Sequence, residues 1–544
     1  MKEYLHNAVR SSLEALGITP VPPIVFERPK QAGHGDVSTT VAMTLAKQLR
    51  RNPRDLAADI IARLSLDPSL VSKVETAGPG FINFTITDTF YRRQLQQLLE
   101  RQARFGRSEI GARKRIQVEF VSANPTGPLT VGHGRGAVFG DTVARLLDWT
   151  GHQVEREYYF NNAGRQMRIL GDSVRLRYLE QLGESVAFPE DYYQGEYIRD
   201  IARGLKETYG ETLRDEPAEG KFKEAAEGDI FADIKKTLQR LGIVFDTFYN
   251  EHTLYTDGKI TDVVSALREK GLVYEQDGAL WFKTSALGGE KDKVIVKSTG
   301  EPTYRLPDIA YHREKFRRGF DRMIDVFGAD HIATYPDVLS ALQALDLDAS
   351  RVSVLIHQFV TIVQGGEVVK MSTRKANFIT LDELIDEVGP DVVRYFFIMR
   401  TISSHLNFDL GLAKQQSDEN PVYYLQYAHA RISSILRYAG KSGARESTVN
   451  ADTELLVALE ELALIKLLLR FPETVESCAL TCEPHRLADY LHDVAGTFHS
   501  FYQAHRVVSD DVRLTGARLA LVRAVQIVLR NGLTVLGIAA PEQM

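Results

Sequence analysis

Cysteine is scarce in this chain, which has only Cys478 and Cys482 among its 544 residues. Two cysteines cannot build a disulfide framework, and by themselves they cannot complete a four-ligand zinc site. His485 follows closely and offers a third ligand, but buried or half-exposed free thiols are the better interpretation. We therefore expect no structural zinc and no other resident metal.

Long hydrophobic runs are lacking as well. The first residues, MKEYLHNAVRSSLEALG, hold no apolar stretch of signal-peptide length, and nowhere do about 18 apolar residues occur together. We therefore expect a cytoplasmic protein with no membrane partner. The formal net charge is -6, so a strong positive charge is also absent, which argues against a chain coated in nucleic acid.

A local basic surface is still compatible with this charge. Residues 1–110 hold 15 Lys or Arg against 11 Asp or Glu, so the remainder of the chain is acidic. A basic amino-terminal module suits contact with a polyanion, although chance fluctuation explains so small an excess about equally well.

The chain is long enough for three or four domains at roughly 100 to 200 residues each. Residues 1–110 combine helical periodicity with the alternating strand FINFTIT and predict an α+β module. Residues 111–409 contain further strand patterns at LWFKT, KVIVKS, RMIDVFG and VSVLIHQFVTIV, with insertions at about 165–275. Residues 410–544 keep only helical periodicity, which predicts an α-helical bundle.

The second domain opens with a strand at 116–121, a Pro/Gly turn and a helix from about Gly134. This order is the first unit of a Rossmann-type nucleotide-binding sheet. The stretch PLTVGHGRGAVFGD, at 128–141, has glycines that permit close backbone approach, and the helix after it offers free N–H groups to an anion beside His133. Because the glycines match neither GxGxxG nor a Walker A loop, a structural turn is at least as good an interpretation.

A second candidate site lies downstream in GGEVVKMSTRKANFITLDELI. Lys370, Arg374 and Lys375 cluster in a loop before a helix that Thr380 and Glu383 are spaced to cap. Three cations in a short loop suit a leaving pyrophosphate, but a solvated charged loop is the simpler alternative for this stretch alone.

Together the two stretches resemble the paired motifs of class I aminoacyl-tRNA synthetases, whose HIGH-type and KMSKS-type sequences bracket ATP. Here they read TVGH at 130–133 and KMSTR at 370–374. The blocks EFVSANPTGPLTVGHGRGAVFGD, TYRLPDIAYHREKFRRGFDRMIDVFGADH and NPVYYLQYAHARI resemble those of arginyl-tRNA synthetases in particular. This resemblance extends over essentially the whole chain.

The resemblance implies a multidomain α/β protein with a class I Rossmann-type catalytic domain between the amino-terminal module and the helical bundle. It implies an arginine–tRNA ligase that activates L-arginine with ATP and Mg²⁺ to arginyl-adenylate. The arginyl group then passes to the 2′-hydroxyl of tRNA(Arg), with release of AMP and pyrophosphate. The amino-terminal module is expected to touch the tRNA elbow and the bundle to bind the anticodon, and a monomer is expected.

Site residues follow from the same resemblance. Catalytic roles fall to His133, Lys370 and Lys375, with Arg374 as the alternative to Lys375. The residues expected to bind ATP are Ala123, Asn124, Pro125, Thr126, Gly127, Pro128, Leu129, Thr130, Val131, Gly132, His133, Gly134, Lys370, Met371 and Ser372. Those expected to bind arginine are Glu119, Asn124, Tyr304, Asp308 and His331.

The arginine pocket also makes chemical sense. A carboxylate such as Asp308 can pair bidentately with a guanidinium, and an aromatic ring such as Tyr304 can cover it. The simpler alternatives are that Tyr304 packs in the core and that Asp308 caps a helix. His331 stands where some relatives carry glutamine, so its contact with the substrate is less firmly implied.

Three residues depart from the family pattern. Thr130 replaces the first histidine of the HIGH-type motif, so His133 should carry more of the phosphate contact. Thr373 stands in place of a lysine in the second motif, and Asn162 stands where an aspartate is expected.

Other interpretations remain open at this point. A synthetase of glutamyl or cysteinyl specificity would keep both motifs, a non-catalytic RNA-binding relative would keep the fold, and a small cytidylyltransferase-like enzyme would keep the HIGH-type motif. For RNA contact the bundle offers aromatic and basic side chains, most of which must be core: Tyr423, Tyr424, Tyr427, His429, Arg431, Tyr438 and Tyr502.

Overall fold

The computed structural model describes residues 1–29, 31–162, 164–369, 379–441 and 451–544. Backbone contacts divide the chain into two units. The first comprises Met1–Phe105, Ile432–Phe471 and Gly496–Val528, and the second comprises Gly106–Arg431, Pro472–Ala495 and Leu529–Met544. The carboxy-terminal helices therefore contribute to both units, and the three-domain division at 110 and 409 stays a prediction.

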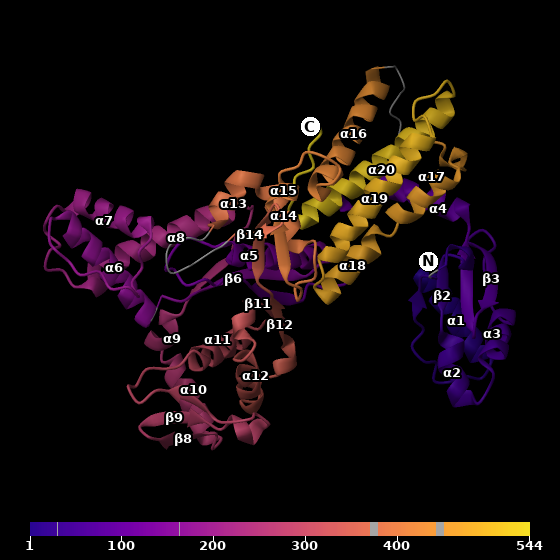
Figure 1. The fold of residues 1–544 in the computed structure, drawn as a ribbon. Helices are drawn as coiled ribbons and strands as arrows, with labels where there is room; N and C mark the ends of the chain where they lie inside the picture. The colour runs from indigo at the N-terminus through magenta and orange to yellow at the C-terminus, as the bar shows by residue number, and fades with distance from the viewer. Residues whose placement is uncertain (30, 163, 370–378, 442–450) are drawn as a thin grey trace. The chain divides into compact units, whose positions relative to one another are not determined.

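The amino-terminal part of the first unit is the α+β module that the sequence predicts (Figure 1). Its antiparallel sheet has the order β1-β2-β4-β3, with strands β1 (Phe26–Glu27), β2 (Val37–Thr39), β3 (Val71–Ala77) and β4 (Phe81–Ile86). Its helices are α1 (Lys2–Ala15), α2 (Val41–Leu49), α3 (Pro53–Ala62) and α4 (Asp88–Arg101). Ile82 and Phe84 of the alternating strand pack in one core with Leu5 and Val9 of α1.

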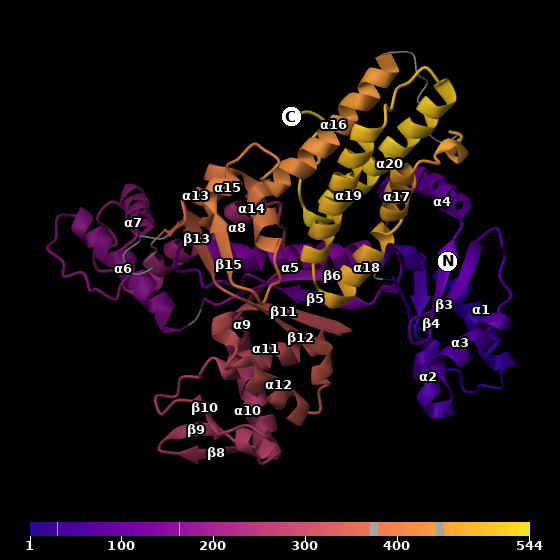
Figure 2. The same ribbon diagram turned by 45° about the vertical axis from the view of Figure 1, so that its right-hand side comes forward.

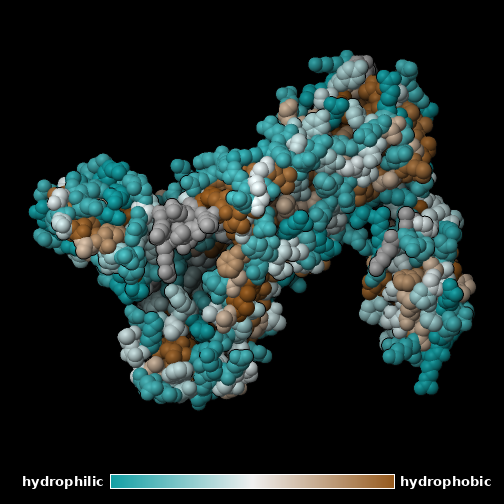
Figure 3. Space-filling model, viewed as in Figure 1, coloured by the Kyte–Doolittle hydropathy of each residue, from teal (hydrophilic) through white to brown (hydrophobic). Residues whose placement is uncertain are grey.

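The helical bundle of the carboxy-terminal segment is also confirmed. It consists of α16 (Pro421–Lys441), α17 (Leu459–Leu468), α18 (Phe471–Thr481), α19 (His485–Ala504) and α20 (Val512–Leu536). Helix α20 is long and apolar enough to cross a membrane, but 83% of its most apolar window is buried inside the protein. Its burial is that of a core helix. The face of the molecule that Figure 3 shows is largely hydrophilic.

The second unit contains a five-stranded parallel sheet of order β12-β11-β5-β6-β7. Its strands are β5 (Arg115–Glu119), β6 (Gln153–Phe160), β7 (Thr247–Asn250), β11 (Arg322–Gly328) and β12 (Val352–His357). Helix α5 (Val131–Trp149) joins β5 to β6, while α11 (Arg305–Arg317) precedes β11 and α12 (Tyr335–Ala344) follows it. In the two views of Figures 1 and 2, α5 lies on one side of the strands and α11 and α12 lie on the other.

Not every predicted strand joins this sheet. The stretches LWFKT and KVIVKS supply β9 (Ala279–Phe282) and β10 (Lys293–Val296), which form a separate antiparallel sheet with β8 (Val273–Gln276). The stretch VSVLIHQFVTIV is broken after His357, and its second half is β13 (Val360–Gln364), paired with β14 (Glu367–Val368) and β15 (Leu406–Asp409).

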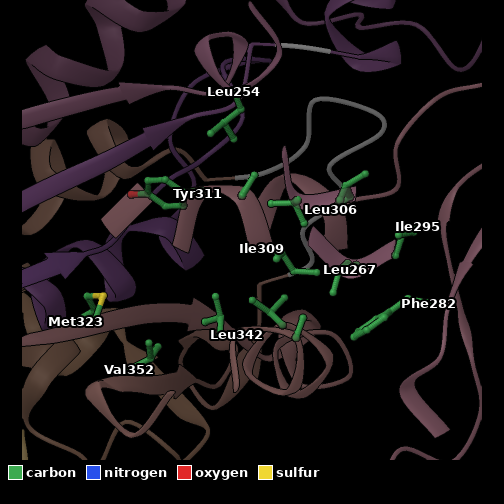
Figure 4. Packing of buried hydrophobic residues seen from close by; sticks show 14 of the residues in the cluster. Leu254, Leu267, Phe282, Ile295, Leu306, Ile309, Tyr311, Met323, Leu342 and Val352 are labelled. Carbon is green, nitrogen blue, oxygen red and sulfur yellow. The ribbon is translucent and has the colours of Figure 1, made fainter. Parts of the chain in front are cut away.

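Further helices fill the insertion and the segment after the second motif. They are α6 (Arg165–Gln181), α7 (Glu196–Tyr209), α8 (Lys223–Arg240), α9 (His252–Thr256), α10 (Lys259–Glu269), α13 (Leu381–Val388), α14 (Pro390–Ile398) and α15 (Leu410–Ala413). Figure 4 shows the hydrophobic core that fixes α11 in place. Leu306 and Ile309 of α11 pack there with Leu342 of α12, Met323 of β11 and Leu267 of α10.

Candidate active site

The parallel sheet reverses its strand order between β5 and β11. From β5 the chain continues to β6 and β7 on one side, and it later adds β11 and β12 on the other. In sheets of this kind, ligands bind in the crevice beyond the carboxyl ends of the strands where the order reverses. Because β5 ends at Glu119, this predicted residue lies at that point.

The turn that follows β5 has a strained backbone. Val121 and Ser122 have φ angles of 67° and 40°, which residues other than glycine rarely adopt. Hydrogen bonds fix the turn: the Ser122 hydroxyl donates to Glu119 over 3.0 Å, and the Tyr158 hydroxyl donates to the Ala123 carbonyl over 2.7 Å. Such strain gathers at functional sites, where the surroundings impose a conformation that the chain alone would avoid.

His133 lies in the first turn of α5, which begins at Val131 rather than near Gly134 as the sequence predicts. The backbone N–H of Thr130 donates to Nδ1 of His133 over 3.2 Å. In the neutral ring the proton is therefore on Nε2. Burial lowers the pKa of His133, which favours that neutral ring. His133 thus lies at the amino-terminal end of α5, where the helix dipole favours an anion.

The glycines of the first motif have different roles. A Cβ on Gly134 would lie 2.6 Å from Leu381, and one on Gly136 would lie 3.0 Å from Nε2 of His357. Packing alone therefore requires a small residue at these two positions. A Cβ on Gly132 would meet no atom closer than 3.6 Å. Of these three glycines, Gly132 is the one that leaves space for a ligand.

The segment after the second motif reaches the first motif. The backbone N–H of Leu381 donates to the carbonyl of Leu129 over 2.8 Å, and Thr130 and Thr380 form an isolated antiparallel bridge. Two stretches about 250 residues apart in the chain therefore meet at the start of α5. This contact is what a shared site for both motifs requires.

The predicted helix cap at Thr380 is present. Its backbone N–H donates to Glu383 Oε2 over 2.6 Å, and the Glu383 N–H donates to the Thr380 hydroxyl over 3.1 Å. This capping box fixes the first turn of α13. The predicted second-motif residues Lys370, Met371, Ser372, Thr373, Arg374 and Lys375 lie outside the described residues.

Arg135, two residues after His133, is only 1% exposed. Its guanidinium donates to the carbonyls of Gln358 over 2.9 Å, Ser404 over 2.8 Å and Thr401 over 3.0 Å. Burial lowers the pKa of this group to about 10. Arg135 thereby ties α5 to the chain just after β12, which is where the single predicted strand is broken in two.

A hollow of about 280 Å³, including its mouth, lies between α11, α12 and the ends of β11 and β12. It brings together two of the predicted arginine-binding residues, Asp308 and His331, with His331 stacked on Phe327 at a ring separation of 4.8 Å. The remaining residues of its lining are mixed polar and apolar: His312, Thr334, Tyr335, Val338, Leu339 and Val354.

Two carboxyl groups lie near one another, and one of them, Asp308, lines this hollow. Burial raises the pKa of Asp308 from its ordinary value of 3.8 to about 7, and the charges of Glu119 and Glu251 add to the effect. Burial also raises the pKa of Glu251, whose carboxylate accepts a 2.9 Å hydrogen bond from the Tyr159 hydroxyl. Within the described part of the chain, neither Asp308 nor Glu251 has an ion-pair partner, so a bound cation would relieve both.

Glu251 was not among the predicted site residues. It directly follows β7, so it stands at the carboxyl end of a sheet strand as Glu119 does. That position, with an acid placed after the apolar stretch TFYN, is the signal in the sequence that could have identified it.

Tyr304 is 69% exposed, so the alternative that it packs in the core is wrong. It precedes the first turn of α11, and Asp308 one turn later donates its backbone N–H to the Tyr304 carbonyl over 3.2 Å. Residues spaced by four share a side of a helix, so the ring can reach a ligand held by Asp308. No side-chain cap is formed at this helix start, so the capping role considered for Asp308 is also absent.

Two asparagines connect the sheet to the insertion helices. Asn124 donates its amide to Gln166 of α6 over 2.7 Å. Asn162, in the place of the expected aspartate, donates to Glu227 of α8 over 2.7 Å. An aspartate at 162 would instead put two carboxylates together, so asparagine fits this neighbour.

The two cysteines are buried. Burial raises the pKa of the Cys478 thiol to about 12, and Arg322 lies 3.9 Å from Sγ of Cys482. In the described ranges, no group of three His, Cys, Asp or Glu side chains is arranged to hold a metal ion.

Three family models match the chain in order. They are the arginyl tRNA synthetase N terminal domain at residues 3–86, the tRNA synthetases class I (R) catalytic domain at 94–394 and the DALR anticodon binding domain at 425–544. An arginine–tRNA ligase of Desulfotalea psychrophila is 56% identical over 95% of this chain and 94% of its own length. The chain belongs to the arginyl-tRNA synthetases.

Further relatives agree with this membership. The arginine–tRNA ligase of Salinibacter ruber is 50% identical over the full length of both chains. The fold matches the arginyl-tRNA synthetase of Thermus thermophilus with a TM-score of 0.78 over both full chains, at 23% identity. The enzyme is therefore an arginine–tRNA ligase with a class I catalytic domain, and ATP, arginine and tRNA(Arg) are its substrates. Glutamyl or cysteinyl specificity and a cytidylyltransferase-like activity are excluded.

Proposed function

We propose that the enzyme, a cytoplasmic monomer, works in two steps at the crevice between β5 and β11. In the first step a carboxylate oxygen of L-arginine attacks the α-phosphorus of Mg²⁺-bound ATP, and the bond to the bridging oxygen breaks to release pyrophosphate. In the second step the 2′-hydroxyl of the terminal ribose of tRNA(Arg) attacks the carbonyl carbon of arginyl-adenylate, and AMP leaves. The ribose proton passes to solvent or to the departing phosphate.

The first step needs positioning and charge stabilisation more than covalent help. We assign this task to the Nε2–H of His133 and to Lys370 and Lys375, with residues 123–134 and 370–372 around ATP. What supports the assignment is that Leu381 and Leu129 are hydrogen-bonded, because this contact puts the segment that follows the second motif beside the first motif.

The arginine side chain is assigned to the hollow beside α11. Asp308 and Glu251 bind the guanidinium, Tyr304 covers it, and His331 lines the wall. Glu119 and Asn124 receive the α-ammonium group. The observation that carries this pocket is the pair of acids without an ion-pair partner among the described residues, since they favour a cation over any neutral side chain.

Contact with tRNA is assigned to the amino-terminal module and to the bundle. Tyr438 of α16 is 63% exposed and suits stacking on a base. His429 is only 1% exposed and lies 2.8 Å from the Pro541 carbonyl, so it is removed from the candidates that the sequence suggests.

The decisive test of the proposed pocket is ATP–pyrophosphate exchange measured in the presence of tRNA for each amino acid. Exchange should occur with arginine alone, and citrulline, which has the same shape without the charge, should be inactive. Exchange with citrulline at a comparable rate would contradict a pocket built on paired acids.

Two glycine variants separate packing from ligand binding. Gly134→Ala forces a Cβ to within 2.6 Å of Leu381 and should lower the free energy of unfolding by about 1–3 kcal/mol. Gly132→Ala should leave that free energy unchanged or slightly higher, because alanine favours a helix, but should raise the KM for ATP. Urea unfolding and aminoacylation kinetics measure the two effects. If both variants lost stability equally, space for a ligand at Gly132 would be disproved.

A further inference from the structure

Glu119 is enclosed rather than open to solvent, being only 3% exposed. Lys315 of α11 places Nζ 2.6 Å from Oε2 of Glu119, and the Ser122 hydroxyl donates to Oε1 over 3.0 Å. A carboxylate has about four acceptor positions, so these two partners leave room for further donors. Glu119 is the last residue of β5, so we assign that remaining capacity to the crevice at the end of this strand.

Lys315 does not serve Glu119 alone. Its Nζ also lies 2.6 Å from Oδ1 of Asp325 in β11, and both Lys315 and Asp325 are fully buried. The other carboxylate oxygen of Asp325 lies 2.8 Å from Nε2 of His312. Two acids on neighbouring strands therefore share one ammonium group, and each competes for its charge.

This sharing has a consequence for the substrate. We propose that Lys315, divided between Glu119 and Asp325, is a positioning residue that sets the charge on Glu119 and thereby the affinity for the α-ammonium group of arginine. The inference rests on the proposed contact between Glu119 and that ammonium group. Lys315 is fully buried, so in this proposal it acts through Glu119 and does not touch the substrate itself.

The surroundings of Glu119 act in opposite directions. Burial raises the pKa of Glu119, Lys315 lowers it and Asp325 raises it again. Loss of Asp325 should therefore favour the ionised form of Glu119, and loss of Lys315 should favour the protonated form. The titratable groups that face Glu119 come from α11, β11 and β6: Asp308, Tyr311, His312, Lys315, Asp325, Glu157 and Tyr159.

A core ion pair with no role in binding would not produce shifts of opposite sign. The test uses Asp325→Asn and the double variant Lys315→Met with Asp325→Asn. The double variant avoids leaving two buried acids without a cation, which would threaten folding. Thermal unfolding of each variant, with and without saturating arginine, reports whether it is folded.

Inhibition constants are measured in aminoacylation from about pH 5.5 to 8 for two competitors. One is L-argininol, which keeps the α-ammonium group and the guanidinium of arginine but cannot be activated. The other is 5-guanidinopentan-1-ol, which lacks the α-ammonium group. The ratio of the two constants cancels the titration of Asp308, because both compounds carry the same alkylguanidinium group, which stays charged throughout this pH range.

In the wild type the advantage of the amine-bearing compound should shrink at acid pH. Asp325→Asn should move this pH dependence of the ratio to lower pH. The double variant should move it to higher pH and should reduce the ratio about 10-fold at neutral pH. Unmoved profiles, or shifts in the same direction, would overturn the role of Lys315. If the double variant is unfolded, the direction of the Asp325→Asn shift decides by itself.

Glu119→Gln tests the assumption beneath the proposal. It should abolish the pH dependence of the ratio and most of the advantage of the amine. If Glu119→Gln discriminates between the two compounds as well as the wild type does, the proposed contact of Glu119 fails. If it loses that discrimination while the Asp325 and Lys315 variants keep the wild-type profile, only the role of Lys315 fails.

Discussion

Replacing Asp308 with asparagine is expected to lower kcat/KM for arginine by at least about 10²-fold. The change removes the negative charge that we assign to the guanidinium, and truncation of one partner in a buried, hydrogen-bonded charge pair costs several kcal/mol. Aminoacylation of tRNA(Arg) at varied arginine concentration measures the effect. Most of it should fall on KM, because the contact is made with the bound substrate as well as in the transition state.

The same substitution should make the free enzyme more stable at pH 8. The pKa of Asp308 rises from its ordinary value of 3.8 to about 7 in the folded protein, so the folded state binds this proton more tightly than the unfolded state does. Stability contributed by that proton is therefore lost as the pH rises from about 4 to 7. Asparagine has no charge to bury, so the free energy of unfolding at pH 8 should rise by on the order of 1–2 kcal/mol. This gain is smaller than the full pKa shift implies, because Asp308 is half-buried and water screens its charge.

Asp346→Asn is the matched control, since Asp346 is 80% exposed and pairs with Lys270 at the surface. It should change neither arginine affinity nor stability measurably. An Asp308→Asn enzyme with wild-type kcat/KM, or one destabilised at pH 8, would contradict the assignment of Asp308 to the guanidinium.

His133→Ala is expected to lower kcat about 10²–10³-fold and to leave the KM for arginine nearly unchanged. We assign its Nε2–H to the charge that develops on the phosphates, and loss of one such preorganised donor has effects of this size. Single-turnover formation of arginyl-adenylate with tRNA present isolates the step. Loss of arginine binding instead of kcat would show that His133 supports the pocket and not the phosphates.

Thr130→Val is the control for His133. The hydrogen bond that orients the imidazole comes from the backbone N–H of residue 130, which valine retains. A loss of activity much smaller than that of His133→Ala is expected, since valine removes only the hydroxyl that caps the start of α5 and lies 3.3 Å from Nδ1.

The departure at Thr130 shows what a motif alone does not reveal. From the sequence, the missing histidine predicts that His133 makes more of the contact with the phosphates. The structure adds that a main-chain group holds His133 in place, so residue 130 can vary without disturbing the ring. A backbone donor leaves no trace in the residue types, because every residue except proline supplies it.

The paired motifs and the parallel sheet follow from the sequence, because each depends on local pattern or on the family resemblance, and most of the proposed arginine pocket rests on the same resemblance. The shared ammonium of Lys315 does not. Glu119 and Asp325 are visible as acids in the apolar strands RIQVEF and RMIDVFG, but nothing local says that these strands are neighbours. Only the packing of α11 on that sheet brings Lys315 between them.

The break after His357 was beyond prediction for a similar reason. The stretch VSVLIHQFVTIV has the composition of one continuous strand. The carbonyl of Gln358 instead accepts from Arg135, more than 200 residues earlier in the chain. A distant buried guanidinium therefore outweighs local strand preference.

The contact between Asn162 and Glu227 constrains the order in which this protein can have changed. If an ancestor carried aspartate at 162, position 227 could not also have been glutamate without two carboxylates in contact. The less costly order is then a change at 162 first, or an uncharged residue at 227 until that change. Two variants test this order: Asn162→Asp should lower the free energy of unfolding in the wild type, and it should be tolerated in the Glu227→Gln variant.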